Sequence, residues 1–290
     1  MPAPARASVL PVLPLSAVAA AFLLLYGRLL IDLSRTWNVD QNYSHGFLIP
    51  PVIAYLVWNR RAEFAAAEIR PAATGLLIVL GSLILLLAAT AGVEFFLMRA
   101  SAIGVIAGIV VFLAGWGWLR LLLFPLGISL LMIPLPPVLF YQIAFPLQLL
   151  ATKVGVAALH LLAIPVLREG NVIALAHTTL EVTEACSGIR SLMSLFVLAV
   201  LYGYLTDPRN AVRLLIALSS IPVAIVSNGL RITGTGIAAH YFGPSAASGF
   251  LHAFSGLAVF VTSLLMLVVL ANGMRRCLSP PVSQGETATS

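Results

Sequence analysis

Residues 72–93, AATGLLIVLGSLILLLAATAGV, contain no charged side chain and lie between Pro71 and Glu94. A helix that crosses the hydrocarbon core of a bilayer needs about 20 predominantly apolar residues, and this stretch has that length. Uncharged stretches of similar or greater length recur at residues 7–27, 41–59, 100–119, 121–152, 214–230 and 232–274. The repetition predicts a helical protein that crosses the membrane several times.

The composition supports a membrane protein over a soluble one. Hydrophobic residues make up 60% of the 290 residues and charged residues only 9%, against roughly 25% charged in soluble domains. A net charge of +6 raises the question of nucleic acid, but the cations stand singly or in pairs at the edges of the uncharged stretches. That pattern does not predict nucleic-acid binding. Two cysteines, Cys186 and Cys277, are too few for a disulfide scaffold or a Cys-rich metal site.

The predicted fold is an all-α polytopic membrane protein with about eight transmembrane helices. We expect a single membrane domain over residues 1–276 and a short disordered cytoplasmic tail over 277–290. Residues 138–163 are predicted to form a helix in the membrane interface. Ile173 to Val182 are rich in β-branched residues and predict a small extracytoplasmic hairpin before the sixth span. The eight expected spans are 9–30, 43–59, 73–92, 99–117, 119–134, 187–206, 212–234 and 252–273.

The distribution of Lys and Arg predicts that both termini are cytoplasmic. A cleaved signal peptide at the N-terminus is the alternative, but no polar mature domain follows it, so an uncleaved first span is favoured. Arg213, on the cytoplasmic side, is expected to act through its charge alone. With the N-terminus inside, nine cations lie at cytoplasmic ends and seven elsewhere. The nine are Arg6, Arg60, Arg61, Arg70, Arg120, Arg209, Arg213, Arg275 and Arg276.

Three polar residues on three different predicted spans lie at similar depth. Cys186 stands 21 residues before the turn that follows the sixth span, Arg231 stands 18 residues after Arg213, and His252 stands 23 residues before Arg275. At about 1.5 Å per residue, the three lie roughly 31, 27 and 34 Å from the cytoplasmic face. Cys186, Arg231 and His252 are therefore predicted to share one level near the outer surface.

The chemistry of these three residues is complementary. A helix N-terminus or a nearby cation favours the nucleophilic thiolate of a cysteine. A planar guanidinium suits a thiolate or the oxyanion of a tetrahedral intermediate, and an imidazole can move the proton between attacking and leaving groups. Each residue alone has a simpler explanation: a buried inert cysteine, an arginine that extends to the headgroups, a histidine that caps a helix. Together, Cys186, Arg231 and His252 predict acyl-transfer chemistry.

Five further residues are candidates for supporting or substrate-binding roles. Ser187 and Gly188 would present free backbone amides at the start of the sixth helix, which suits an oxyanion hole. Arg190 is a candidate for binding a substrate carboxylate, or extends to the interface. Asn228 stands one turn before Arg231, and either orients it or makes an ordinary interhelical hydrogen bond. His45 is predicted on the outer side, where it would line the same vestibule.

Several motifs in this sequence resemble the exosortase/archaeosortase family. They are Glu181-Val-Thr-Glu-Ala-Cys-Ser-Gly-Ile-Arg190, Asn228-Gly-Leu-Arg231, His252-Ala-Phe-Ser-Gly256, Tyr43-Ser-His-Gly-Phe-Leu-Ile-Pro50 and Pro134-Leu-Pro136, and the resemblance extends over about residues 40–273. The histidine at the third catalytic place is similar to the bacterial exosortase branch. The resemblance implies a membrane cysteine transpeptidase of the inner membrane whose catalytic Cys, Arg and His fall on Cys186, Arg231 and His252.

The resemblance also implies partners and a location. The substrates would be exported proteins with a C-terminal sorting signal: a short Pro-Glu-Pro-type (PEP-CTERM-like) motif, a membrane span and a basic cluster. The site would face the periplasm, and the acceptor, whether lipid-linked, polysaccharide-linked or water, stays open. Membrane lipid is expected as a partner and nucleic acid is not, and no metal or organic cofactor is implied. The alternative is a non-catalytic transporter or an assembly subunit for exopolysaccharide export, although we find no inverted repeat.

Overall fold

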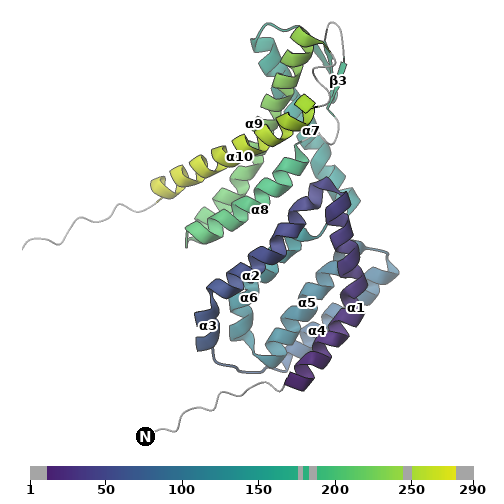
Figure 1. Ribbon diagram of the computed structural model, residues 1–290, viewed down its shortest axis with the longest axis vertical. Coiled ribbons are helices and arrows are strands. Elements are labelled where there is room, and N and C mark those ends of the chain that lie inside the picture. Colours follow the sequence, from purple (N-terminus) through teal and green to yellow (C-terminus); the bar gives the residue numbers. More distant parts are fainter. Residues whose placement is uncertain (1–11, 176–178, 183–187, 244–249, 279–290) are drawn as a thin grey trace, which may run out of the picture. The chain divides into compact units, whose positions relative to one another are not determined.

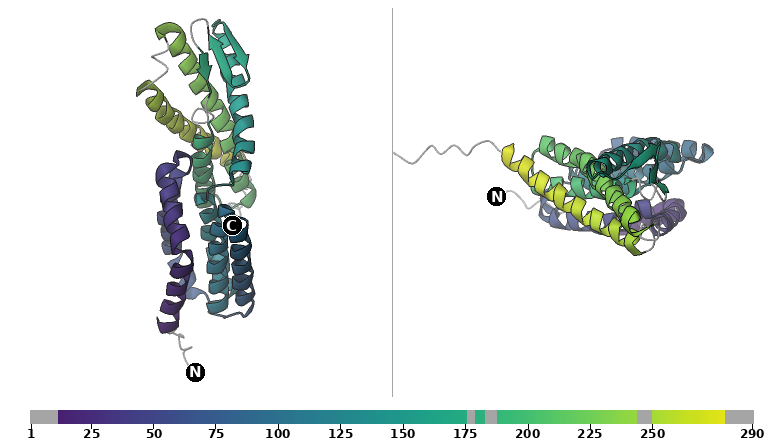
Figure 2. Two further views of the ribbon diagram at one scale, coloured as in Figure 1. Left: turned by 90° about the vertical axis from the view of Figure 1, so that its right-hand side faces the viewer. Right: turned by 90° about the horizontal axis from the view of Figure 1, so that it is seen from above.

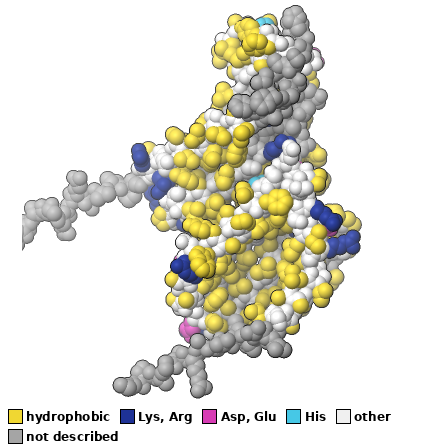
Figure 3. Space-filling model, viewed as in Figure 1, with side chains coloured by type: hydrophobic (Ala, Val, Ile, Leu, Met, Phe, Trp, Pro, Cys, Tyr) yellow, Lys and Arg dark blue, Asp and Glu magenta, His cyan; other side chains and the backbone are white. Residues whose placement is uncertain are grey.

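The computed structural model describes residues 12–175, 179–182, 188–243 and 250–278. Side chains of residues 12–14, 181 and 250–255 are not described. The described chain is mostly helical (Figures 1 and 2), and apolar side chains cover much of the face drawn in Figure 3. These features confirm an all-α polytopic membrane protein. The chain divides into two compact units, Met1–Pro136 and Pro137–Ser290, and the single membrane domain expected over residues 1–276 stays a prediction.

The boundary between the units falls within Pro134-Leu-Pro-Pro137. Proline lacks a backbone donor and disfavours helical geometry in the residue before it, so helix formation stops there and restarts at Pro137. Unit 1, the part before the boundary, consists of α1 (Val12–Val39), η1 (Gln41–Leu48), α2 (Ile49–Asn59), α3 (Arg61–Ala66), α4 (Thr74–Ala91), α5 (Phe95–Leu113), α6 (Trp116–Ser129) and η2 (Leu130–Met132).

In unit 1, the helix starts follow local sequence signals. The Asp40 side chain accepts a hydrogen bond from the backbone amide of Asn42 at 2.9 Å and caps the 3-10 helix η1. Glu94 caps α5 by accepting from the amides of Phe96 and Leu97, as carboxylates do at helix N-termini. Because η1 occupies residues 41–48, α2 is only 11 residues long, shorter than the span expected over 43–59.

Unit 2, the part after the boundary, combines four helices with a small sheet. Its elements are α7 (Pro137–Leu161), β1 (Val166–Glu169), β2 (Val172–Leu175), β3 (Thr179–Glu181), α8 (Ile189–Thr206), α9 (Asn210–Phe242) and α10 (Phe250–Cys277). The strands are antiparallel in the order β1-β2-β3. Glu169 pairs with Val172 across a tight turn, and the hairpin expected over 173–182 therefore begins earlier, at Val166, and gains a third strand.

The long helix α9 contacts different partners along its two halves. Its N-terminal half packs with α8 and α10, where Leu195, Ile216 and Leu267 are at most 1% exposed. Its C-terminal half packs with α7 and the sheet, and Ile173 and Ile232 lie in that second core. Since 33 residues of helix extend about 50 Å, α9 is longer than the roughly 30 Å hydrocarbon core.

Seven described helices are long and apolar enough to cross a membrane: α1, α4, α5, α7, α8, α9 and α10. All except α7 overlap with expected spans, although α1 and α9 extend eight or nine residues beyond the expected ends at 30 and 234. The helix α7 was expected in the interface and is instead a 25-residue apolar helix that packs along α9. Residues 116–132 form a shorter apolar helix, so the expected number of eight spans depends on this segment and on α2.

Candidate functional site

The chain that follows Cys186 is packed directly against α9. Gly188 is the N-cap of α8 and has a positive φ of 82°, a conformation that glycine adopts without a steric cost. A β-carbon built on Gly188 would lie 3.0 Å from both Cβ and Cγ of Asn228, which is 1% exposed. Glycine is therefore needed at this position for two separate reasons, and the contact fixes residue 188 beside Asn228.

Arg231 connects the same part of α9 to α10. Asn228 and Arg231 are three residues apart in a helix and so lie on neighbouring positions of one face. The half-buried Arg231 side chain extends to α10, where a β-carbon on Gly256 would lie 3.8 Å from its Nη2 atom. His252 precedes Gly256 by four residues, about one helical turn, within α10. Contacts of Gly188 with Asn228, and of Arg231 with Gly256, thus join the start of α8, the middle of α9 and the first part of α10.

Val182, which precedes Cys186 by four residues, is anchored by two amide side chains. Val182 is 3% exposed, and its carbonyl accepts hydrogen bonds from Nε2 of Gln148 on α7 and, at 3.3 Å, from Nδ2 of Asn171. The Val182 amide donates to the Asn171 carbonyl at 2.9 Å. Val182 and Gly188, the described residues on either side of this part of the chain, are therefore each fixed by contacts with other elements.

Gln148 and Asn171 were not among the predicted site residues. A signal for Gln148 was present in the sequence, because a primary amide within an apolar helix is costly unless it is hydrogen-bonded. The acceptor is 34 residues away in the chain, and the pairing becomes visible only in the folded chain. Within the described residues, both side chains donate to the backbone carbonyl of Val182.

Of the predicted site residues Cys186, Ser187 and Arg190, the structure describes only Arg190. Cys186 and Ser187 lie outside the described residues, and α8 begins at Ile189, three residues after Cys186. The sixth span was expected to start at residue 187, and the helix starts two residues later because Gly188 with its positive φ forms the N-cap. Arg190 is half-buried in the first turn of α8, and its Nε atom is enclosed with no acceptor among the described residues.

His45 is enclosed within unit 1. It is 6% exposed, its Nε2 lies 3.1 Å from the Leu131 carbonyl, and its ring contacts Tyr43. Nearby, the Tyr43 hydroxyl accepts from the Leu135 amide at 3.0 Å, and Trp37 Nε1 donates to the Met132 carbonyl at 2.8 Å. The Tyr-Ser-His-Gly segment thus fastens the chain just before the proline-rich boundary, and the geometry of His45 favours a supporting role in unit 1.

In unit 2 the described groups can serve acyl transfer. The guanidinium of Arg231 on α9 reaches α10 at Gly256, and Asn228, one turn earlier in α9, contacts Gly188 at the start of α8. Such a fork provides directed donors for an anionic sulfur or oxygen. Within the described ranges, no three His, Cys, Asp or Glu side chains gather as a metal site.

Comparison with known proteins identifies a family. The model of a protein family described as transmembrane exosortase matches residues 37–269 of this chain. The matched range contains α8, α9 and the part of α10 that carries the contacts described above. Neither the curated proteins nor the solved structures contain a match to the chain.

Proposed function

The chain belongs to the transmembrane exosortase family, and on that premise we propose that it is a membrane cysteine transpeptidase in which Cys186, Arg231 and His252 perform the reaction. Family membership supports a membrane transpeptidase or protease role in general. The single observation that supports the assignment of residues is the reach of Arg231 from α9 to Gly256 of α10, one helical turn after His252.

In the proposed first step, the Cys186 thiolate attacks the carbonyl carbon of the scissile peptide bond. The resulting oxyanion accepts hydrogen bonds from Arg231 and from backbone amides at the start of α8, with Ser187 and Gly188 as candidates. As the C–N bond breaks, the imidazolium of His252 gives a proton to the departing amine. The products are a thioester between Cys186 and the N-terminal part of the substrate, and the released C-terminal segment, which begins with a free amine.

In the proposed second step, a nucleophile replaces the thiolate. An acceptor amine or hydroxyl, or water, loses a proton to His252 and attacks the thioester carbon, and the C–S bond breaks. An acceptor yields transfer and water yields cleavage. We propose that Gln148 and Asn171 position the segment with Cys186, that Asn228 positions its far end, and that Arg190 takes part in substrate binding.

The proposed substrates are exported proteins that carry a C-terminal Pro-Glu-Pro-type sorting signal. The proposed location is the inner membrane, with both termini cytoplasmic and the site facing the periplasm. One structural feature supports this orientation: Arg209, Arg213 and Arg275 meet at one end of unit 2, separated from Gly188 by the 18 residues of α8, about 27 Å of helix. Family membership favours this reading over a transporter or an export subunit.

The decisive experiment is to trap the thioester. The full chain is co-expressed with an exported reporter that ends in a Pro-Glu-Pro motif, a membrane span and a basic cluster. We expect a covalent adduct on Cys186 that hydroxylamine releases and that is missing in Cys186→Ala, while that variant remains folded and inserted. Cys277→Ala serves as the control and should form the adduct normally. Normal processing by Cys186→Ala would overturn the assignment of the nucleophile.

A further inference from the structure

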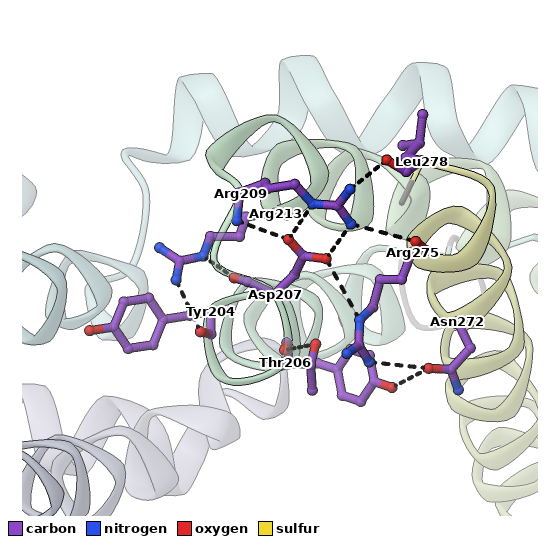
Figure 4. A network of polar contacts seen from close by, with 9 residues as sticks. Tyr204, Thr206, Asp207, Arg209, Arg213, Asn272, Arg275 and Leu278 are labelled. Carbon is purple, nitrogen blue, oxygen red and sulfur yellow. Dashed lines mark hydrogen bonds and ion pairs between the residues drawn. The ribbon is translucent and has the colours of Figure 1, made fainter. Parts of the chain in front are cut away.

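The end of unit 2 that lies away from Gly188 contains a second polar centre (Figure 4). It is formed by the α8–α9 turn and the last turns of α10, and it gathers four arginines around a single carboxylate. The residues are Asp207, Arg209, Arg213, Arg275 and Arg276. None of them takes part in the proposed reaction.

The carboxylate of Asp207 is fully engaged. Arg209 donates to it from Nε at 3.0 Å, from Nη2 at 2.7 Å and from the backbone amide at 2.8 Å, and Nε of Arg275 lies 3.7 Å from Oδ2. The hydrogen bonds from Arg209 hold the pKa of Asp207 at about 2. Asp207 is therefore ionised at neutral pH and offsets one of the four positive charges, so a charge of about +3 remains.

Two of the arginines have structural roles. Arg209 also donates to the Leu278 carbonyl at 2.5 Å, and Arg213 donates to the carbonyls of Asp207 at 2.6 Å and Tyr204 at 3.3 Å. The expectation that Arg213 acts through charge alone is therefore wrong, because its guanidinium closes the turn. By contrast, Arg276 is exposed and makes no hydrogen bond or ion pair with the described part of the chain.

A cavity of ≈ 530 Å³ opens between the turn and α10. Its lining consists of Thr206, Asp207, Pro208, Arg209, Asn272, Arg275 and Arg276. The Thr206 hydroxyl donates to the Tyr202 carbonyl, so the amide and guanidinium groups are the donors available beside the net positive charge. Guanidinium groups match the planar, multi-oxygen geometry of phosphate. The volume lies in the range of small-molecule sites. The chemistry of the lining thus fits a phosphate group.

The surroundings of the cavity identify the source of that phosphate. Leu205, Leu214, Val269 and Leu278 lie on the adjoining ends of α8, α9 and α10, and between 48% and 72% of each is exposed. An occupant with an anionic head and apolar chains would satisfy both the arginines and these side chains. We propose that this pocket binds the phosphate of an anionic membrane phospholipid, with the acyl chains along the exposed apolar residues of unit 2. This inference goes beyond the proposed function.

Arg276→Gln is the cleanest test, since Arg276 makes no hydrogen bond or ion pair within the described chain and its loss should not disturb folding. The full chain is purified in neutral detergent and titrated with phosphatidylglycerol or phosphatidylcholine of equal chain length, with bound lipid measured by native mass spectrometry. We expect the wild type to prefer phosphatidylglycerol, and Arg276→Gln to bind it about fivefold more weakly. Arg120→Gln, which removes an equally exposed arginine of α6 in unit 1, should bind like the wild type.

A competition experiment distinguishes a phospholipid ligand from a free soluble anion. Inorganic phosphate or glycerol phosphate at millimolar concentration should displace little phosphatidylglycerol, because neither provides acyl chains. Displacement at micromolar phosphate would make this a site for soluble anions and overturn the proposal. Equal affinity for the two lipids, or equal losses in Arg276→Gln and Arg120→Gln, would also overturn it, since general attraction to arginine would then explain the binding.

Discussion

At the residue scale, Arg231 is the side chain of α9 that reaches α10 near Gly256. Arg231→Lys keeps the positive charge and removes the planar fork. If Arg231 donates directed hydrogen bonds to the thiolate or the oxyanion, the exchange is not conservative. Loss of one oxyanion donor costs about 10²–10³ in rate, so we expect reporter processing to fall by about two orders of magnitude, with insertion unchanged.

The control for Arg231→Lys is Arg276→Lys, because Arg276 is exposed and makes no hydrogen bond or ion pair within the described chain. It should process the reporter at the wild-type rate. Arg213 is unsuitable as a control, since it makes directed hydrogen bonds to the carbonyls of Asp207 and Tyr204. Equally mild effects at positions 231 and 276 would remove Arg231 from the active site.

Gly188 is the second residue whose identity matters for the site. In Gly188→Ala the new β-carbon meets Asn228 at 3.0 Å, in a backbone with φ of +82°. Left-handed geometry costs a non-glycine residue roughly 1–2 kcal/mol, and the contact adds to this cost. We expect a lower thermal unfolding temperature and at least tenfold slower processing.

Gly170→Ala separates the two effects at Gly188. Gly170 has a similar φ of +63°, but a β-carbon there meets nothing within 4 Å. It should show the backbone strain alone, with nearly normal processing. If Gly188→Ala and Gly170→Ala behave alike, the contact with Asn228 has no part in holding the segment that contains Cys186.

At the scale of elements, α7 holds the strand end that leads to Cys186. Gln148→Leu removes the donor to the Val182 carbonyl and leaves Asn171 as the remaining partner. A neutral hydrogen bond contributes about 0.5–1.5 kcal/mol, so we expect kcat to fall roughly three- to tenfold with little change in KM. Gln142→Leu, on the exposed side of the same helix, should have no effect. A change in KM alone would instead indicate that Gln148 contacts the substrate.

The turn between α8 and α9 should respond to acid. The native pKa of Asp207, about 2, lies below its ordinary value of 3.8. The ionised carboxylate therefore stabilises the folded state when the pH is above the ordinary pKa of 3.8. This contribution disappears as the pH falls from about 4 to about 2. We expect Asp207→Asn to lower the unfolding temperature at pH 7, and the difference from wild type to shrink across that window.

Glu169→Gln provides the comparison for Asp207→Asn. Glu169 is an exposed carboxylate in β1, without an ion pair in the described chain. At each pH between 7 and 3, Glu169→Gln should unfold at the same temperature as the wild type. A difference between wild type and Asp207→Asn that stays constant through the acid window would show that the Arg209 interaction does not stabilise the folded state.

At the scale of the whole molecule, the orientation in the membrane can be measured with cysteine labels. We predict that Glu169→Cys, in the sheet, reacts with an impermeant thiol reagent in cells whose outer membrane is permeabilised. Cys277, exposed at the end of α10, should react only after the inner membrane is opened. Glu169→Cys is made in a chain in which both native cysteines are replaced, and Cys277 is tested in a chain in which Cys186 is replaced. The reverse pattern would invert the topology and place the site in the cytoplasm.

The sequence alone determined the class of fold and the candidate residues. Apolar length identifies membrane helices because every backbone group in the hydrocarbon core must be paired within its own helix, and α4 and α5 fall close to their expected spans. The same local argument places Cys186, Arg231 and His252 at one depth, since the rise per residue of a helix is constant.

Tertiary structure alone decided which side chains meet. The hydrogen bond from Gln148 to Val182, the contact of Gly188 with Asn228, and the reach of Arg231 to Gly256 join elements far apart in the chain. Local sequence patterns contain no information on such pairs, because periodicity gives depth and face but not the neighbour. The engagement of Arg213 in the turn and the enclosure of His45 likewise follow from packing, which decides whether a polar group points to solvent or to a backbone carbonyl.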